Sequence, residues 1–155
     1  MLEAGKEFGI APCGLGARNT LRLEAKMALY GHEISESISV WEAGLDRFCK
    51  MEKDDFIGRA ALEKQRAVGL KHVLVGLEVV ERGIARDDYT VHDEHGARIG
   101  YVTSGSPAPF LKKNIALAYV PPKFSSVGTN IWVDVRGQKV RAQVVPTPFY
   151  KRPKK

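Results

Sequence analysis

Two arginines in one predicted helix are the residues whose type and spacing best suit chemistry. Arg18 and Arg22 lie four positions apart in GLGARNTLRLEAKMALYGHE, residues 14–33. Side chains at that spacing project side by side from a helix, and paired guanidiniums can bind a dicarboxylate or a phosphate through bidentate hydrogen bonds. The positive helix N-terminus just before them would strengthen the binding of an anion. Spacing alone favours the alternative, in which one or both arginines pair with acids such as Glu24 or Glu42.

Other patterns that could support chemistry are weaker. The GLG at residues 14–16 falls short of a nucleotide-binding glycine loop. His92 and His95 lie three apart in a predicted turn rather than on one helix face, so they do not predict a metal site. Ser104 and Ser106 lie in VTSGSPAP, which lacks a nucleophile elbow and whose composition predicts a loop. No pair of carboxylates stands out for acid/base work.

The composition is that of a globular protein of about one domain. The 155 residues are 44% hydrophobic and 27% charged, with a net charge of +6 and a pI near 9.4, which favours an acidic partner or an anionic ligand. Cys13 and Cys49 lie far apart without nearby ligands, so we predict neither a disulfide framework nor a zinc site but a reducing, cytoplasmic compartment. No apolar run approaches the ~18–20 residues that span a bilayer.

Two helices are predicted in the first half of the chain. Apolar residues recur every four positions from Ala17 to Leu29, which predicts a helix that ends near Gly31. A second helix is predicted over about 56–68, with Asp55 as its N-cap and Gly69 as its end.

From residue 70 onward the sequence is typical of β-structure. Strands are predicted in HVLVGLEVV, on both sides of the turn at 94–96, and in IALAYVPP. Alternation over 131–135 and 140–144 around a glycine turn predicts a hairpin with one apolar face. The chain is therefore predicted to be α+β, with a helical N-terminal segment followed by a small antiparallel barrel or sandwich.

The two ends of the chain raise separate questions. LEAGKEFGIAPCGLG is typical of the end of a helix followed by a turn, as if a domain were entered partway through. The C-terminal PFYKRPKK mixes aromatic and basic residues, a combination that suits nucleic acid. A frayed, solubilising terminus is the alternative.

Several blocks taken together resemble a known family. GLGARNTLRLEAKMALYGHE, WEAGLDRF with KDDFIGRAAL, ERGIARDDY, GYVTSGSPAPFLKKNIALAYVP and VRGQKVRAQVVPTPFYKR look like the C-terminal part of the glycine cleavage system T-protein, an aminomethyltransferase. The similarity runs in order from about residue 14 to residue 152.

The resemblance implies a domain organisation. Residues 1–50 are expected to be the C-terminal remnant of a folate-binding domain, 51–70 a linker helix, 71–150 a C-terminal β-barrel domain and 151–155 a basic tail. The family protein has a larger N-terminal portion that precedes the residues matched here.

The resemblance also implies a reaction. The family takes an aminomethyl group from the lipoyl arm of an acidic carrier, the H-protein, and transfers its methylene to tetrahydrofolate with release of ammonia. The carboxylate that orients the folate nitrogen lies in the larger N-terminal portion, so no catalytic residue is assigned here. Arg18 matches the arginine of the GLGAR motif at the folate site, and Arg152 is expected to reach the same pocket. Arg22 is expected to brace the helix.

The sequence departs from the family pattern at a few positions. Asn19 replaces an aspartate, Lys26 replaces a small residue, and residues 46–48 replace a more apolar stretch. Asn19 is expected to keep its capping ability but to lose a charge that could orient Arg18.

Alternatives remain open at this point. Flavin-linked demethylating dehydrogenases have a similar folate module, so the aminomethyl donor is not fixed. A basic binding module for nucleic acid or an acidic protein is the non-enzymatic alternative, whereas the T-protein interpretation predicts no nucleic-acid partner and no membrane. The chain by itself is expected to be inactive, and uncovered apolar faces in residues 1–50 predict a homodimer.

Overall fold

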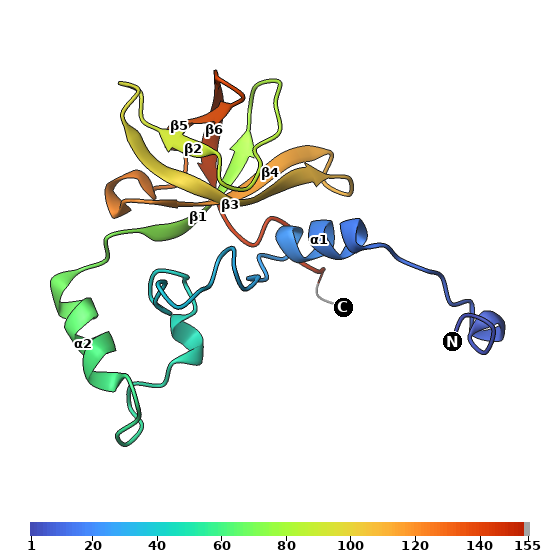
Figure 1. The fold of residues 1–155 in the computed structure, drawn as a ribbon, viewed down its shortest axis with the longest axis horizontal. Helices are drawn as coiled ribbons and strands as arrows, with labels where there is room; N and C mark the ends of the chain where they lie inside the picture. Colours follow the sequence, from blue (N-terminus) through green and yellow to red (C-terminus); the bar gives the residue numbers. More distant parts are fainter. Residues whose placement is uncertain (154–155) are drawn as a thin grey trace.

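The β-rich half of the sequence closes into a six-stranded antiparallel barrel in the computed structural model, which describes residues 1–153 (Figure 1). The strand order is β1-β4-β3-β2-β5-β6, and β1 closes the barrel because it pairs with both β4 and β6. The predicted helical segment followed by a small antiparallel barrel is confirmed. The strands are β1 (Val73–Val79), β2 (Thr90–His92), β3 (Arg98–Ala108), β4 (Lys113–Val120), β5 (Asn130–Val135) and β6 (Gln138–Val145).

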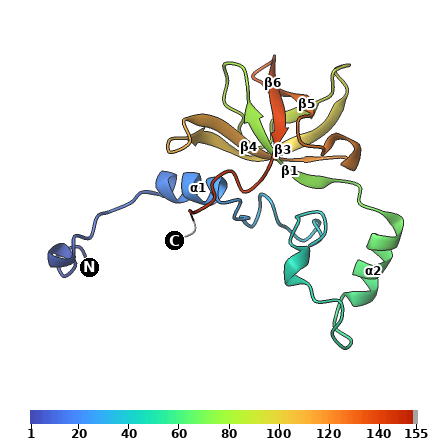
Figure 2. The same cartoon turned by 180° about the vertical axis from the view of Figure 1, so that it is seen from behind.

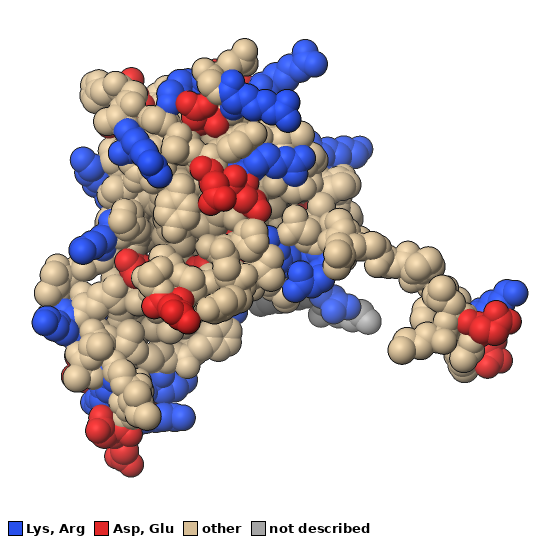
Figure 3. Space-filling view, viewed as in Figure 1, with Lys and Arg blue, Asp and Glu red and all other residues tan. Residues whose placement is uncertain are grey.

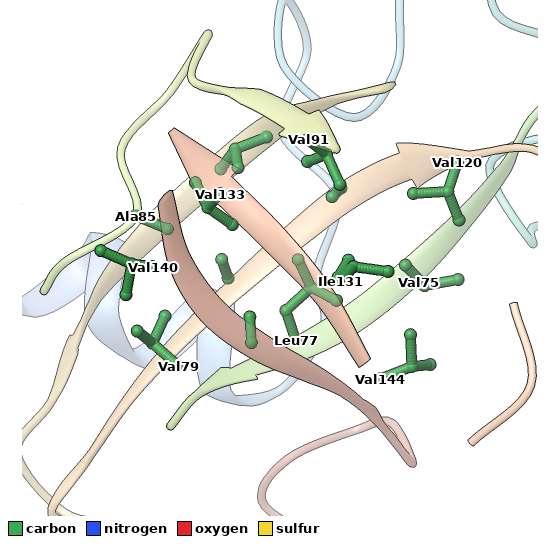
Figure 4. Packing of buried hydrophobic residues seen from close by; sticks show 14 residues of the cluster. Val75, Leu77, Val79, Ala85, Val91, Val120, Ile131, Val133, Val140 and Val144 are labelled. Atoms are coloured by element: carbon green, nitrogen blue, oxygen red, sulfur yellow. The ribbon is translucent and has the colours of Figure 1, made fainter. Parts of the chain in front are cut away.

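The barrel interior is filled by the alternating apolar residues that the sequence displays. In the β5–β6 hairpin Ile131 and Val133 face inward beside Val140, Ala142 and Val144, and all are buried (Figure 4). Alternate residues of a strand share one face, so this pattern commits the hairpin to one register. Inward-facing residues from the other strands complete the core: Val75, Leu77, Val79, Val91, Val102, Ala116, Ala118 and Val120, with Ala85 from the loop after β1.

Strand β4 is covered on both sides. Every residue from Ile115 to Val120 is buried, which explains why IALAYV is a continuous apolar run rather than an alternating one. Ile115 and Leu117 point outward and form a second cluster with Ala108 of β3 and Leu23 of the N-terminal segment. This second cluster is where the N-terminal segment packs on the outside of the barrel.

The sequence VTSGSPAP was predicted to be a loop, and that prediction is wrong. Ser104 and Ser106 lie within β3, where both are buried. A methyl group on Gly105 would lie 2.2 Å from the carbonyl oxygen of Ala85, so the small residues of this stretch let the loop after β1 approach the strand. Small residues therefore serve close packing here rather than a turn.

Helix α1 (Leu15–Glu24) is shorter than predicted and buries a different face. It ends at Glu24 rather than near Gly31, because Lys26 takes the left-handed conformation (φ 54°) and the N–H of Met27 bonds back to the carbonyl of Arg22. Leu23 is fully buried, whereas Leu21 of the predicted apolar stripe is 65% exposed. Leu23 is the apolar residue that packs this helix on the barrel, whereas Ala17 and Leu21 of the predicted stripe are exposed.

Helix α2 (Arg59–Val68) lies away from the barrel and buries none of its residues (Figure 1). It ends at Gly69 as predicted but begins three residues late, because Gly58 has φ 94° and cannot belong to a right-handed helix. Asp55 is therefore not its N-cap. The indole N–H of Trp41 donates to the carbonyl of Leu62 at 3.1 Å and ties the preceding loop to this helix. Neither helix has the length and apolar character needed to cross a membrane.

Candidate site at helix α1 and the C-terminal segment

A buried ion pair fastens helix α1 to the barrel. Arg22 Nη1 lies 3.0 Å from Glu33 Oε2, and the two side chains are 8% and 0% exposed. Arg22 Nη2 also donates to the hydroxyl of Ser104 on β3 at 2.8 Å, and Arg22 Nε donates to Asn19 Oδ1 at 3.0 Å. One guanidinium thus joins the helix, the segment that follows it and a barrel strand.

The carboxylate of Glu33 is held from the barrel side as well. The hydroxyl of Thr103 donates to Oε1 at 2.7 Å, and the backbone N–H of Leu29 donates to Oε2 at 3.0 Å. The hydroxyl of Tyr119 donates to the backbone carbonyl of Glu33 at 2.7 Å. Burial raises the pKa of Tyr119 above its ordinary value, and the nearby Tyr101, Glu42 and Glu33 raise it further, so this phenol stays protonated and remains a donor.

This cluster gives Arg22 a bracing role, as the sequence led us to expect, but with an unexpected partner. Neither acid that spacing suggested is the partner: the Glu42 carboxylate accepts hydrogen bonds from Ser39, and the Glu24 carboxylate forms no ion pair with Arg22. Glu33 lies eleven residues after Arg22, beyond the end of the helix, where helical spacing carries no signal. The chain reversal at residues 25–32 brings the two together.

Arg18 lies one helical turn before Arg22 on α1. Its side chain is exposed, and within residues 1–153 it forms no ion pair. The alternative in which one of the two arginines pairs with an acid therefore holds for Arg22, whereas Arg18 has no ion-pair partner among residues 1–153. The capping role expected of Asn19 is wrong, because Asn19 lies inside α1 and Gly14 is the N-cap; its side chain accepts from Arg22.

The C-terminal segment returns to the same helix. The N–H of Tyr150 donates to the carbonyl of Glu24 at 2.9 Å, and its ring lies edge-on to Phe110 in the β3–β4 turn, with centroids 5.2 Å apart. Figures 1 and 2 both show this segment running beside α1. Arg152 follows two residues later and is exposed. Lys154 and Lys155 of the predicted basic tail lie outside the described residues.

The resulting surface combines free cations with uncovered apolar side chains. Leu15 and Leu21 on α1 are 84% and 65% exposed, and Phe110 is 70% exposed. Such a surface suits an amphipathic anion, whose charged group would pair with a guanidinium while its apolar part covers the leucines. No cluster of three potential metal ligands occurs among residues 1–153.

Comparison with known proteins identifies two family models. The C-terminal barrel domain of the glycine cleavage T-protein matches residues 72–151, and the N-terminal domain of the same proteins matches residues 1–53. Together the two matches contain both the barrel and helix α1.

Individual relatives give the same result. An aminomethyltransferase of Koribacter versatilis is 65% identical over 155 residues, and one of Desulfitobacterium hafniense (strain DSM 10664 / DCB-2) is 50% identical over 152 residues. These matches cover 100% and 98% of this chain, which spans 41% of the length of each relative. The crystal structure of glycine cleavage system aminomethyltransferase T from Bartonella henselae superposes with a TM-score of 0.84 at 34% identity, covering 88% of this chain and 39% of that chain.

Proposed function

This chain belongs to the glycine cleavage T-protein family, and from that premise we propose that residues 1–155 form the C-terminal part of a tetrahydrofolate-dependent aminomethyltransferase. The observation that carries the proposal is the match over the whole chain to an aminomethyltransferase at 65% identity, although the chain spans only 41% of that relative. In this proposal residues 1–50 complete a folate-binding domain, 51–70 link it to the barrel of 71–150, and 151–155 form a basic tail.

The proposed reaction moves a methylene group from the aminomethyl-lipoyl arm of the H-protein to tetrahydrofolate and releases ammonia. Tetrahydrofolate ends in a glutamate, so an unpaired guanidinium can hold its carboxylates through charge-assisted hydrogen bonds. Arg18 is exposed and free of ion pairs within residues 1–153, which fits this role. Arg152 follows the segment that bonds to the end of α1, which supports its assignment to the same folate site.

The buried cluster supports the same site indirectly. Arg22 lies one helical turn after Arg18, and its bonds to Glu33 and Ser104 fix α1 on the barrel. A fixed helix holds Arg18 at a constant place relative to the C-terminal segment. Positioning of this kind improves binding because less freedom is lost when the ligand arrives.

Residues 1–155 alone are proposed to be inactive. No carboxylate pair in them suits the orientation of the folate nitrogen, and the relatives that catalyse the reaction are longer. Addition of aminomethyl-loaded H-protein and tetrahydrofolate to this chain is expected to give no ammonia above background, whereas a longer protein containing the preceding domain is expected to turn over. Ammonia release by residues 1–155 would contradict the proposal.

The decisive test of the folate site is calorimetric titration of the chain with tetrahydrofolate. Arg18→Ala is expected to weaken binding by about ten- to a hundredfold, the loss of a hydrogen bond to a charged group. Arg98→Ala is the matched control, because Arg98 is an exposed arginine at the start of β3 and the variant has the same net charge. Equal affinity of the unmodified chain, Arg18→Ala and Arg98→Ala for tetrahydrofolate would show that Arg18 does not contact the ligand. Absence of binding in all three would place the pocket's essential residues in the preceding domain.

The uncovered apolar side chains bear on assembly. Leu15 and Leu21 of helix α1 are 84% and 65% exposed and form an uncovered apolar face in residues 1–50. We propose that, where the preceding domain is absent, two copies of the chain pair through this face in the cytoplasm. Sedimentation of residues 1–155 as a monomer at micromolar concentration would contradict pairing.

A further inference from the structure

A second pocket lies on the side of the barrel away from helix α1, and it has no part in the site described above. Its volume is about 440 Å³, and it lies between the loop after β1 and the turn that joins β5 to β6. Three arginines line it: Arg82, Arg86 and Arg136. Tyr89 and Asn114 complete the polar wall.

The arginines of this pocket have no acidic partners. Within residues 1–153 none of the three forms an ion pair, and two of the acids near them along the chain pair with other residues. Glu81 lies 3.7 Å from Arg141 and accepts its backbone N–H, and Asp87 lies 3.3 Å from His32. Figure 3 shows several lysine and arginine side chains at this end of the barrel, with acidic side chains among them. Uncompensated cations that share a pocket create a site of positive potential.

The backbone at Arg136 makes this residue the most useful one for a test of the pocket. Arg136 and Gly137 form a two-residue hairpin turn with φ values of 56° and 87°. Asn-Gly is the sequence that such a turn prefers, since asparagine tolerates a positive φ better than arginine does. The Arg136 side chain makes no hydrogen bond within residues 1–153 that would offset this strain. A substitution of Arg136 that suits the turn therefore removes the guanidinium without destabilising the hairpin.

We propose that Arg82, Arg86 and Arg136 form a binding pocket for a phosphate-bearing small molecule. A carboxylate has two acceptor oxygens, and one guanidinium fork can pair with both of them. Three guanidiniums supply more donors than one carboxylate accepts, whereas a phosphate group has enough oxygens to accept from several of them. The volume of the pocket admits a ligand larger than one phosphate, and the Tyr89 side chain on its wall offers a surface for the remainder.

Titration with inorganic pyrophosphate at low ionic strength tests the pocket without folate and without activity. Arg136→Asn is the sharpest variant, because asparagine suits the turn but lacks the guanidinium. It is expected to raise the melting temperature in the absence of ligand and to weaken pyrophosphate binding by about tenfold, the effect of one charge-assisted contact. A triple variant with Arg82→Gln and Arg86→Gln added is expected to lose measurable binding.

Arg98→Asn is the matched control, since it removes one exposed arginine that does not line the pocket. An equal loss of affinity in this control would reduce the effect to net charge and overturn the proposal. No binding of pyrophosphate to the unmodified chain at millimolar concentration would overturn it too. Tighter binding of a hexaglutamate peptide with the same dependence on the arginines would assign the pocket to an acidic peptide instead. Because no readout involves folate, either result leaves the proposed function to be judged separately.

Discussion

The barrel and the N-terminal segment are stabilised in opposite ways. In the barrel the buried side chains are almost all apolar, and the polar exceptions are Thr103, Ser104 and Ser106 of β3. In residues 1–58 the buried apolar side chains are only Leu23 and Ala43, whereas Arg22, Glu24, Glu33 and Glu42 are buried polar residues. One region is a closed hydrophobic core and the other is attached through hydrogen bonds.

The difference has a physical consequence. Apolar burial is non-directional, so the barrel gains stability from any arrangement that fills its interior. Hydrogen bonds and ion pairs require particular distances, so the polar cluster sets where α1 lies on the barrel. Removal of one partner leaves the others buried and unsatisfied, which makes such attachment sensitive to single substitutions. We therefore expect the N-terminal segment to separate from an intact barrel when the cluster is broken.

The largest effect is expected from Glu33→Ala. Removal of this carboxylate leaves the Arg22 guanidinium buried without its counter-charge, which costs about 3–5 kcal/mol. Because only Leu23 adds apolar contact between α1 and the barrel, the loss should release the helix locally. Hydrogen exchange is expected to accelerate at the amides of α1 while strands β1 to β6 stay protected.

Two further variants sharpen this prediction. Glu36→Ala removes an exposed carboxylate of the same segment and is expected to leave exchange unchanged. Arg22→Met combined with Glu33→Leu replaces the ion pair with apolar side chains and is expected to recover much of the lost protection. Loss of protection throughout the barrel in Glu33→Ala would show that the two regions unfold as one unit.

The complementary substitution is Leu77→Ala in the barrel. Leu77 is fully buried in the core, so its truncation leaves a cavity and is expected to cost about 2–5 kcal/mol. Here the loss should appear in all six strands at once, because the closed barrel has no strand that can leave alone. Chemical denaturation measures the loss of stability, and hydrogen exchange of the folded protein measures how that loss is distributed over the strands. Faster exchange confined to α1 in this variant would reverse the contrast between the regions.

The sequence predicted the barrel well because its signals are local. Alternation over 131–135 and 140–144 defines a face, and the apolar run at 115–120 defines a strand that is buried on both sides. The prediction failed where small residues are needed for packing, because small residues also favour loops. The composition of VTSGSPAP favours a loop, yet close approach of the loop after β1 requires small residues inside β3.

The N-terminal segment was harder to predict because its contacts are remote in sequence. The helical stripe at four-residue spacing favoured a longer helix, but the turn at Lys26 ends it early. Glu33 gave no signal as the partner of Arg22, since only the reversal of residues 25–32 and strand β3 bring them together. The assignment of Arg18 to a folate site rests on the GLGAR motif and not on a contact in the structure. The titration with tetrahydrofolate tests that assignment.

The smallest of these effects concerns Ser39 and pH. Burial acts to raise the pKa of Glu42, but hydrogen bonds from the backbone N–H and hydroxyl of Ser39, together with the Gln65 side chain and the charge of His72, hold the pKa below its ordinary value. A carboxylate with a lowered folded-state pKa stabilises the fold above its unfolded-state pKa, and this contribution disappears as the pH falls through the folded-state value. Ser39→Ala is therefore expected to cost about 1 kcal/mol at pH 7. The difference in unfolding free energy between this variant and the unmodified chain should become smaller as the pH drops below 4.5, the ordinary glutamate pKa.

Denaturation at pH 7 and at pH 3 measures that gap, with Ser37→Ala as the control because the Ser37 hydroxyl contacts only Ser35. The Glu42 backbone carbonyl accepts from Leu74 at the start of β1, so this carboxylate lies where the segment meets the barrel. If the gap stays constant with pH, Ser39 acts through packing and not through the Glu42 charge. The Glu33 cluster would then be the one charged contact that attaches the N-terminal segment to the barrel. The contrast between the two regions would rest on that cluster and not also on Glu42.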